Sequence, residues 1–338
     1  MMYLLDRRIN VAPMMDWTDR HCRYFLRGFS PHVLLYTEMI TAAAILHGKR
    51  LRLLAFDPEE HPVALQLGGS EPADLAAAAR AGEEAGYDEI NLNCGCPSDR
   101  VASGAFGACL MSEPGRVADC VAAMRARVKL PVTVKLRIGV VEGSPREARE
   151  QAARFDDADY ASLQDFVAQV RAAGCAVAIV HARKAVLRGL SPKDNREVPP
   201  LRYDVVARLK RDVRDLPVVV NGGVRDAAAA LDALNWCDGV MLGREAYHRP
   251  FVLSELEQRM HADAPPAPTR REILERMEAY ASREVARGER LSSITRHMLG
   301  LCAGAPGARE YRRLLSEGAR EPSTTPALLR RAQQVCAA

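Results

Sequence analysis

The feature that most constrains the fold is a series of eight short, mostly apolar segments that alternate with helical ones. Continuous apolar runs of this length are typical of parallel strands buried on both faces. The eight runs lie at 10–15, 33–39, 62–69, 89–96, 131–139, 176–183, 217–223 and 239–244. The helical segments between them include 71–86, 113–128, 162–174, 202–213 and 226–234. Eight strands alternating with helices predict an α/β fold, the (β/α)8 TIM barrel.

The 338 residues are enough for such a barrel and a small second domain. A proline-rich stretch at 261–270 follows the last predicted strand and is expected to end helical order. Beyond it, 271–288 and 294–317 have amphipathic helical patterns, which indicate a small all-helical C-terminal domain. The predicted division is 1–255 for the barrel, 256–264 for a linker and 265–338 for the helical domain.

Two long connections interrupt the barrel pattern. Residues 140–161, after the fifth strand, are highly charged, and we expect a long or partly ordered loop on the active-site face. Residues 184–204, after the sixth strand, are rich in basic and turn residues.

The net charge of +4 comes entirely from the C-terminal part of the chain. Residues 1–255 contain 33 basic and 33 acidic residues, whereas 256–338 contain 14 arginines, no lysine and 10 acidic residues. Guanidinium groups bind phosphate oxygens bidentately, so this composition favours a phosphate-rich partner. A solvated helical surface with intrahelical ion pairs has the same composition, and charge alone does not separate the two interpretations.

The chain has neither the pattern of a secretory signal at its start nor a run of about 18 apolar residues. We therefore expect a cytoplasmic protein with no membrane partner. The nine cysteines are scattered along the sequence and are expected to be reduced thiols in that compartment.

Glycines end the last two predicted strands, on the face where a TIM barrel carries its active site. Asn221, Gly222 and Gly223 end the seventh strand, and Gly243 and Arg244 end the eighth. Glycines there let backbone N–H groups approach a phosphate. The two motifs on neighbouring strands predict a phosphate-bearing cofactor or substrate.

Other strand ends indicate which phosphate compound this is. Pro13, Met14 and Met15 offer apolar backbone, while Gln66 and Lys135 offer polar groups around it. A planar heterocycle with polar edges fits this set, as flavin mononucleotide (FMN) does, with Lys135 near the pyrimidine end of the ring. The spacing alone leaves a second interpretation open, in which Lys135 is a Schiff-base lysine of an aldolase.

The segment INLNCGCPSDRV (90–101) places two cysteines at the end of the fourth strand. A structural zinc site needs four ligands, usually as two close pairs, and Cys94 and Cys96 have no second pair. We therefore predict no metal site. Strand alternation turns Cys94 into the packed core, whereas Cys96 lies one step past the strand. An ordinary cysteine thiol is mostly protonated at neutral pH, so Cys96 is interpreted as a proton donor.

Several of these segments together resemble the tRNA-dihydrouridine synthases, in the same order and over nearly the whole chain. They are APMMDWTDRHCR, LQLGG, NLNCGCPSDRV, GACLM, VHARKAVLRGLSPKDNREVPPL, VVNGGV and RHMLGLCAGAPGAREYRRLLSE. The long loop after the sixth strand and the last segment are similar to the A subgroup, which is expected to act on uridines 20 and 20a. The charged 140–161 segment is longer than expected in that family.

The resemblance implies a reduction of the C5–C6 double bond of uridine in the tRNA D-loop. NADPH reduces FMN, reduced FMN gives hydride from N5 to C6, and the loop cysteine, here Cys96, protonates C5. The implied FMN contacts are Pro13, Met14, Met15, Gln66, Lys135, His181, Asn221, Gly222, Gly223, Gly243 and Arg244. The implied tRNA contacts are Asn93, Lys193, Arg196, Arg309 and Arg312. DNA is not an expected partner.

Two alternatives stay open at this point. One is an FMN-dependent reductase of a free pyrimidine, of the dihydroorotate or dihydropyrimidine dehydrogenase kind, which would not need the arginine-rich tail. The other is an RNA-binding protein that has lost catalysis, against which Cys96, Lys135 and the phosphate motif argue.

Overall fold

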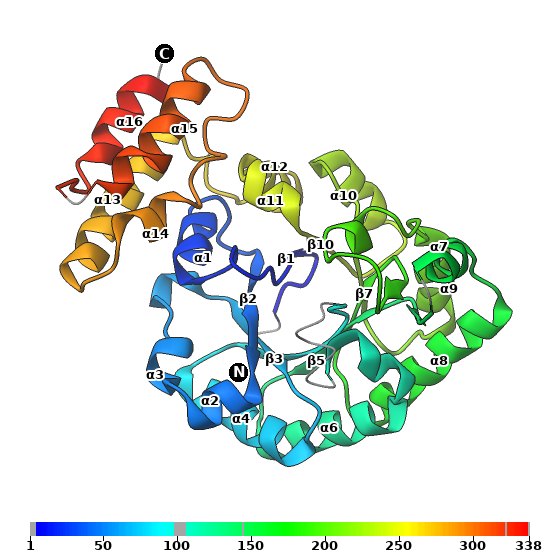
Figure 1. The fold of residues 1–338 in the computed structure, drawn as a ribbon. Coiled ribbons are helices and arrows are strands. Elements are labelled where there is room, and N and C mark those ends of the chain that lie inside the picture. The colour runs from blue at the N-terminus through cyan, green and yellow to red at the C-terminus, as the bar shows by residue number, and fades with distance from the viewer. Residues whose placement is uncertain (1–4, 98–105, 144, 322, 337–338) are drawn as a thin grey trace.

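The structure is a computed structural model, and it describes residues 5–97, 106–143, 145–321 and 323–336. Eight parallel strands form a closed barrel with helices around it (Figure 1). The strands are β1 (Ile9–Val11), β2 (Leu34–Thr41), β3 (Val63–Gly68), β4 (Glu89–Cys94), β5 (Val132–Arg137), β7 (Ala178–His181), β9 (Val218–Asn221) and β10 (Gly239–Leu242). They neighbour one another in this order, and β10 closes the ring on β1. The predicted (β/α)8 barrel is confirmed.

Each predicted apolar run became a strand because helices cover the barrel outside and side chains fill it inside. Every residue of β3 and β4 is buried. The parallel register places Asn93 beside Lys135 on one pair of strands and Arg137 beside His181 on the next. This register gathers the polar strand ends on one rim of the barrel, which we call the mouth.

The barrel helices begin and end where local signals place them. Helices α4 and α6 carry proline in their first turn, and α4 ends at Gly86, whose φ of 97° favours glycine. The helices are α1 (Arg20–Arg27), α2 (Ala42–His47), α3 (Arg50–Leu53), α4 (Pro72–Ala85), α6 (Pro114–Arg127), α8 (Asp157–Ala172), α9 (Tyr203–Asp212), α10 (Ala227–Ala233), α11 (Arg244–His248) and α12 (Phe251–Met260).

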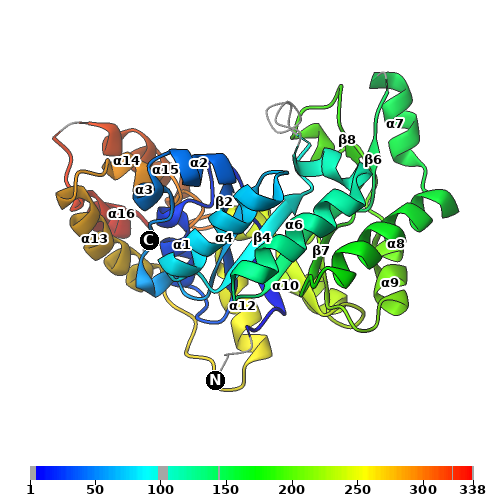
Figure 2. The ribbon, with the colours of Figure 1, turned by 90° about the horizontal axis from the view of Figure 1, so that it is seen from below.

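The charged segment 140–161 is not the loop that the sequence suggested. It forms strand β6 (Val140–Val141), helix α7 (Pro145–Ala153) and the first turn of α8. Strand β6 pairs with β8 (Ala185–Val186), and Ala148 and Ala152 pack with Val186 and Leu190. Figure 2 shows α7, β6 and β8 standing out from the barrel on the opposite side from α13. The alanines make a small apolar face that charge patterning conceals.

The C-terminal part is helical, with one correction. Its helices are α13 (Arg270–Ala286), α14 (Leu291–Thr295), α15 (Ala308–Ser316) and α16 (Leu328–Cys336). The amphipathic stretch 294–317 is not one helix, because turns separate α14 from α15. Gly304 and Gly307 have φ of 78° and 74°, a left-handed conformation that breaks the helix at little cost for glycine.

These helices pack beside α1 (Figure 1). The Tyr280 ring of α13 stacks on that of Tyr24, with centroids 3.9 Å apart, and its hydroxyl lies 2.7 Å from His21 Nδ1. Asp19, the N-cap of α1, pairs with Arg296 at 2.6 Å. The division into two domains stays a prediction; α12 ends at Met260, inside the predicted linker.

Cys302 and Cys336 form a disulfide bond, which corrects the expectation that every cysteine is a reduced thiol. Both residues are buried where α16 packs near the turns that follow α14, and this packing brings their Cα atoms to 6.1 Å. Among the described residues, no helix is long and apolar enough to cross a membrane.

Candidate functional site at the barrel mouth

Asn93 organises the turn that presents Cys96. Its Oδ1 accepts hydrogen bonds from the backbone N–H groups of Gly95 at 3.1 Å and Cys96 at 3.0 Å. Cys96 is partly exposed, while Cys94 is fully buried as expected, and burial raises the pKa of the Cys94 thiol well above its usual range. The predicted loop cysteine is thus held at the mouth by a side chain on the same strand. The rest of the NLNCGCPSDRV segment, from Ser98 on, lies outside the described residues.

A chain of buried side chains fixes Asn93 in turn. Asn93 Nδ2 donates to Gln66 Oε1 at 2.8 Å, and Gln66 Nε2 donates to Asn91 Oδ1 at 2.7 Å. Asn91 Nδ2 then donates to the hydroxyl of Thr133 at 2.8 Å, which bonds to the carboxylate of Glu89. The chain crosses β3, β4 and β5 inside the barrel and holds these amides in one orientation. Sequence reasoning identified Gln66 and Asn93 and missed this connection, because its members come from three strands.

Lys135 and His181 lie beside the buried Arg137. Desolvation, and then the charge of Arg137, lowers the pKa of Lys135 to about 7. Burial and the same neighbouring charges hold the pKa of His181 well below its usual range, so its ring is neutral at pH 7. Arg137 Nε donates to the Gly95 carbonyl at 3.1 Å, so this arginine also supports the turn of Cys96. Arg137 was assigned no role from the sequence. The sequence signal for it was its position at the end of the fifth strand, two residues after Lys135.

The glycine pair after β9 packs against the protein itself. Gly222 and Gly223 have φ of 104° and 76°. A Cβ on Gly222 would lie 2.3 Å from His181 Cδ2, and one on Gly223 would lie 2.3 Å from Leu201 Cδ1. The Tyr203 hydroxyl donates to the Gly222 carbonyl at 2.5 Å. The two glycines are therefore required by backbone conformation and by close approach.

Asn221 and Gly243 occupy neighbouring strand ends. Asn221 Nδ2 donates to the Met241 carbonyl at 2.8 Å, so its amide joins β9 to β10. Gly243 is the N-cap of α11, and a Cβ added to it would lie 3.9 Å from Met14 Sδ.

The segment after β1 borders this part of the mouth. Met14 N–H donates to the Thr18 hydroxyl at 2.9 Å, which fixes the turn, while Pro13 is partly exposed and Met15 is 53% exposed.

Basic side chains surround these strand ends. Arg244 pairs with Glu197 at 2.8 Å, and both side chains are nearly half exposed. Arg183 hydrogen bonds to the Pro199 carbonyl, but its buried Nε has no hydrogen-bond partner in the described structure. Desolvation and the neighbouring Arg244 lower the pKa of Arg196. The cations of the mouth repel one another, and in the part of the chain that the structure describes no ion pair is formed by Arg183 or Arg196.

The predicted tRNA contacts fall into two groups. Lys193 and Arg196 are exposed on the loop that follows β8. Arg309 and Arg312 are exposed on α15, outside the barrel (Figure 1). Most other arginines of the tail form ion pairs in the described structure. Arg276 pairs with Glu59, and the other paired arginines are Arg259, Arg271, Arg283, Arg287, Arg296 and Arg330.

The residues at the mouth fit an anionic cofactor with polar edges. Desolvation, and then repulsion from neighbouring cations, lowers the pKa values of Lys135 and Arg196, so a bound anion would stabilise their charged forms. The Nε of Arg183, which has no hydrogen-bond partner among the described residues, is a donor suited to such an anion. The amides of Gln66 and Asn93 are held with fixed donors and acceptors. These features suit a flavin bearing a phosphate.

Comparison with known proteins decides the family. Residues 10–336 match the dihydrouridine synthase (Dus) family. The chain belongs to that family. The chain is 55% identical over 312 residues to the tRNA-dihydrouridine(20/20a) synthase of Pseudomonas aeruginosa, covering 92% of this chain and 90% of that protein. The proteins of the same name from Xanthomonas campestris pv. campestris and Vibrio vulnificus are 54% and 52% identical, covering 98% and 96% of this chain and 94% and 95% of theirs.

A solved structure of 2-naphthoyl-CoA reductase in complex with 2-naphthoyl-CoA resembles this dihydrouridine synthase in fold alone. The TM-score is 0.53 with 10% sequence identity, over 76% of this chain and about half (51%) of the other.

Proposed function

We propose that this protein reduces uridine in the tRNA D-loop to 5,6-dihydrouridine, at positions 20 and 20a. The observation that carries the proposal is the turn of Cys96, held by Asn93 at a cationic barrel mouth in a chain of the dihydrouridine synthase family. The relatives named above carry the positions 20/20a in their names.

FMN, reduced by NADPH, would supply the hydride that adds to C6 of the base. Lys135 lies two residues before Arg137 on β5, and His181 is the neighbour of Arg137 on β7. Both would contact this cofactor. The other proposed contacts are Pro13, Met14, Met15, Gln66, Asn221, Gly222, Gly223, Gly243 and Arg244. Because neutral His181 adds no positive charge, binding of an anionic group falls to Lys135 and the arginines.

Cys96 is the proposed proton donor. Its thiol gives a proton to C5 as the C5–C6 double bond accepts hydride at C6, so one hydride and one proton saturate the bond. Asn93 fixes the backbone of the turn through its Oδ1, which would place the thiol against the base. The target base must leave its stack to enter the mouth, at a cost of about a few kcal/mol that is smallest in a loop.

The tRNA body would lie across the mouth and α15. Arg196 lies near Cys96 at the mouth and Lys193 is on the same loop, while Arg309 and Arg312 are exposed on α15 of the helical part. Arg309 and Arg312 form no ion pair with another described residue, and exposed arginines suit phosphate contacts, which fix the position of an RNA without reading its sequence.

The experiment that tests this function compares two substrate classes. Wild-type protein with NADPH should form dihydrouridine in tRNA that lacks it, at positions 20 and 20a, and leave free uracil and orotate unchanged. Arg309→Ala/Arg312→Ala should raise KM for tRNA by about tenfold with little change in kcat, and should flatten the salt dependence of binding by about one phosphate contact per arginine.

Arg271→Ala is the matched control for the arginine pair, because Arg271 is an exposed arginine of α13 paired with Glu275. It should leave KM near the wild-type value. Reduction of free pyrimidine without reduction of tRNA would contradict the proposed function and favour the free-pyrimidine reductase.

A further inference from the structure

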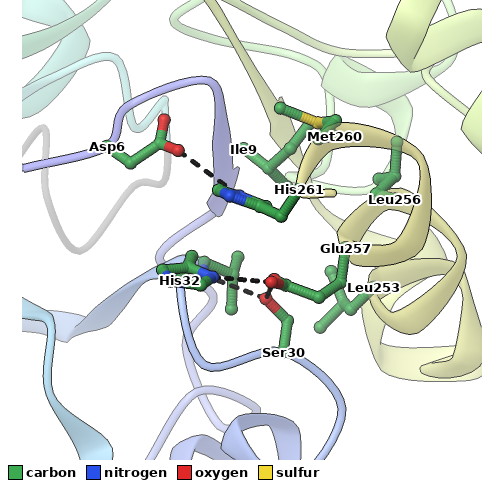
Figure 3. A pocket seen from close by; sticks show the side chains of 10 residues that line it. Asp6, Ile9, Ser30, His32, Leu253, Leu256, Glu257, Met260 and His261 are labelled. Atoms are coloured by element: carbon green, nitrogen blue, oxygen red, sulfur yellow. Dashed lines mark hydrogen bonds and ion pairs between the residues drawn. The ribbon is translucent and has the colours of Figure 1, made fainter. Parts of the chain in front are cut away.

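A cluster of metal-ligating side chains lies at the end of the barrel opposite to the mouth. His32 precedes β2, Glu257 lies in the last turns of α12, and His261 is the C-cap of that helix. Asp6 precedes β1 on the same face. Figure 3 shows the rings of His32 and His261 one over the other, with Glu257 beside His32 and Asp6 joined to His261 on the side away from His32.

The three groups offer ligand atoms at a spacing close to that of a metal site. One ligand atom from each of His32, Glu257 and His261 lies within 4.8 Å of the others. His32 Nδ1 is 2.6 Å from Glu257 Oε1, and the two imidazole rings are stacked with centroids 4.1 Å apart and planes 20° apart. The cavity that these residues line has a volume of about 10 Å³, about the space of a single ion or water molecule.

We propose that His32, Glu257 and His261 bind a divalent transition-metal ion of the Zn²⁺ type, with Asp6 as the fourth ligand. Two imidazoles and carboxylates are ligands that Zn²⁺ accepts in tetrahedral geometry, at about 2.0–2.2 Å. Asp6 Oδ2 lies 3.5 Å from His261 Nε2, so a small rotation of either side chain brings both atoms to one ion. In the His32–Glu257 contact, the ion takes the place of the shared proton.

The surroundings of Glu257 support a bound cation. Its carboxylate is buried, and its second oxygen accepts a hydrogen bond from the Ser30 hydroxyl at 2.5 Å. A ligating carboxylate is typically oriented by such a neighbouring donor. Buried carboxylates occur where they are paired or coordinate a metal ion, and Glu257 already contacts one of the two imidazoles. A metal ion would bind this carboxylate and one ring nitrogen of each histidine, and the two rings would turn from their stacked arrangement to direct those nitrogens at the ion.

Arg8 competes for part of the site. Its guanidinium bonds to Asp6 Oδ2 at 2.6 Å and lies 3.4 Å from His261 Nε2. When the ion binds, Arg8 keeps its second contact, to Asp6 Oδ1 at 3.0 Å, so Asp6 can serve the ion and the arginine with different oxygens. Asp6 is therefore the weakest of the four ligands.

The site joins segments that are far apart in the chain. It ties the approaches to β1 and β2 to the end of α12, where the chain leaves the barrel for the helical part. The N-terminal face of a TIM barrel contributes to stability rather than to chemistry. The metal is therefore structural, and its removal affects folding stability more than turnover.

Titration of the tag-free full-length protein with Zn²⁺ and with Co²⁺ tests this site. One equivalent of metal per chain should bind, and Zn²⁺ should raise the melting temperature by about 2–5 °C. Bound Co²⁺ should give visible d–d absorption without the near-ultraviolet charge-transfer band of thiolate ligands, which separates this site from cysteine binding. His32→Ala and His261→Ala should each weaken binding at least tenfold and abolish the thermal shift.

His47→Ala is the matched control, since His47 is an exposed histidine at the end of α2 and belongs to neither the cluster nor the mouth. It should keep the full stoichiometry and thermal shift. Circular dichroism shows whether each variant is folded; His32 is half exposed, so His32→Ala tests the site even where His261→Ala unfolds. Absence of Co²⁺ d–d bands in the wild-type protein, or binding that His32→Ala leaves unchanged, would overturn the proposal.

Discussion

The two ends of this barrel differ in how their buried charges are paired. At the N-terminal end, buried carboxylates meet cations directly: Glu60 bonds to Arg23 at 2.6 Å, and Glu89 bonds to Arg7. At the mouth, Lys135 and Arg137 lie two residues apart on β5. Desolvation, and then the charge of Arg137, lowers the pKa of Lys135, while desolvation, and then the charges of Arg196 and Arg183, lowers the pKa of Arg137. Among the described residues, Glu60 and Glu89 are thus paired with arginines at one end, whereas no acidic side chain forms an ion pair with Lys135 or Arg137 at the other.

The difference separates stability from ligand binding. A buried charge is tolerated when it is paired, and a set of uncompensated cations lowers stability until an anion arrives. The mouth is therefore suited to an anionic ligand, whereas the buried carboxylates of Glu60 and Glu89 at the opposite end are paired with arginines of this chain. The proposed metal site lies at the same end as these paired charges, and its ion would add to the contacts that Glu257 already makes with His32 and Ser30.

Removing a cation from the paired end should have the largest effect on stability. Arg23→Met leaves the buried carboxylate of Glu60 without its partner and also removes a hydrogen bond of 2.8 Å to the Thr18 carbonyl. We expect a loss of about 3–5 kcal/mol in the free energy of unfolding, measured by urea denaturation. A loss below about 1 kcal/mol would contradict the pairing argument.

Replacing a cation of the mouth with methionine should raise the free energy of unfolding, by less than Arg23→Met lowers it. The pKa of Lys135 is about 7 in the folded protein and about 10.4 in an unfolded chain, so the unfolded chain holds the proton more firmly. The penalty is complete below pH 7 and disappears as the pH rises from about 7 to about 10. Lys135→Met should stabilise the flavin-free protein by more than about 1 kcal/mol at pH 6.

The control for Lys135→Met is its pH dependence. Urea denaturation of variant and wild type at pH 6, 8 and 10 should show a gain that shrinks as the pH rises. A gain that does not change with pH would mean that side-chain shape, and not charge, is its cause.

Much of the fold could be predicted from the sequence because buried parallel strands leave continuous apolar runs. The predicted range 89–96 contains β4, and 71–86 contains α4 with one residue to spare at each end. Helix α7 escaped prediction because its few apolar residues find partners such as Val186, which is distant in the chain. Packing between segments that lie far apart leaves no local pattern.

Only part of the candidate site could be predicted from the sequence, for the same reason. Strand ends identified Lys135 and Cys96, since position at the end of a strand can be read from the sequence. The hydrogen bonds of Asn93 to the turn of Cys96 depend on three-dimensional geometry. The cluster of His32 and Glu257 has no spacing motif, because the two residues are 225 positions apart.

The most direct test of the account replaces Cys96 with alanine and follows dihydrouridine formation in tRNA. Cys109→Ala is the matched control, because Cys109 is also a partly exposed cysteine near the mouth, and its thiol bonds to the Phe106 carbonyl at 3.1 Å. Loss of a positioned proton donor should slow the reaction by about 10²–10⁴-fold in Cys96→Ala. Flavin binding and the activity of Cys109→Ala should stay near the wild-type values. Dihydrouridine formation by Cys96→Ala at the wild-type rate would contradict the proposed role of the mouth.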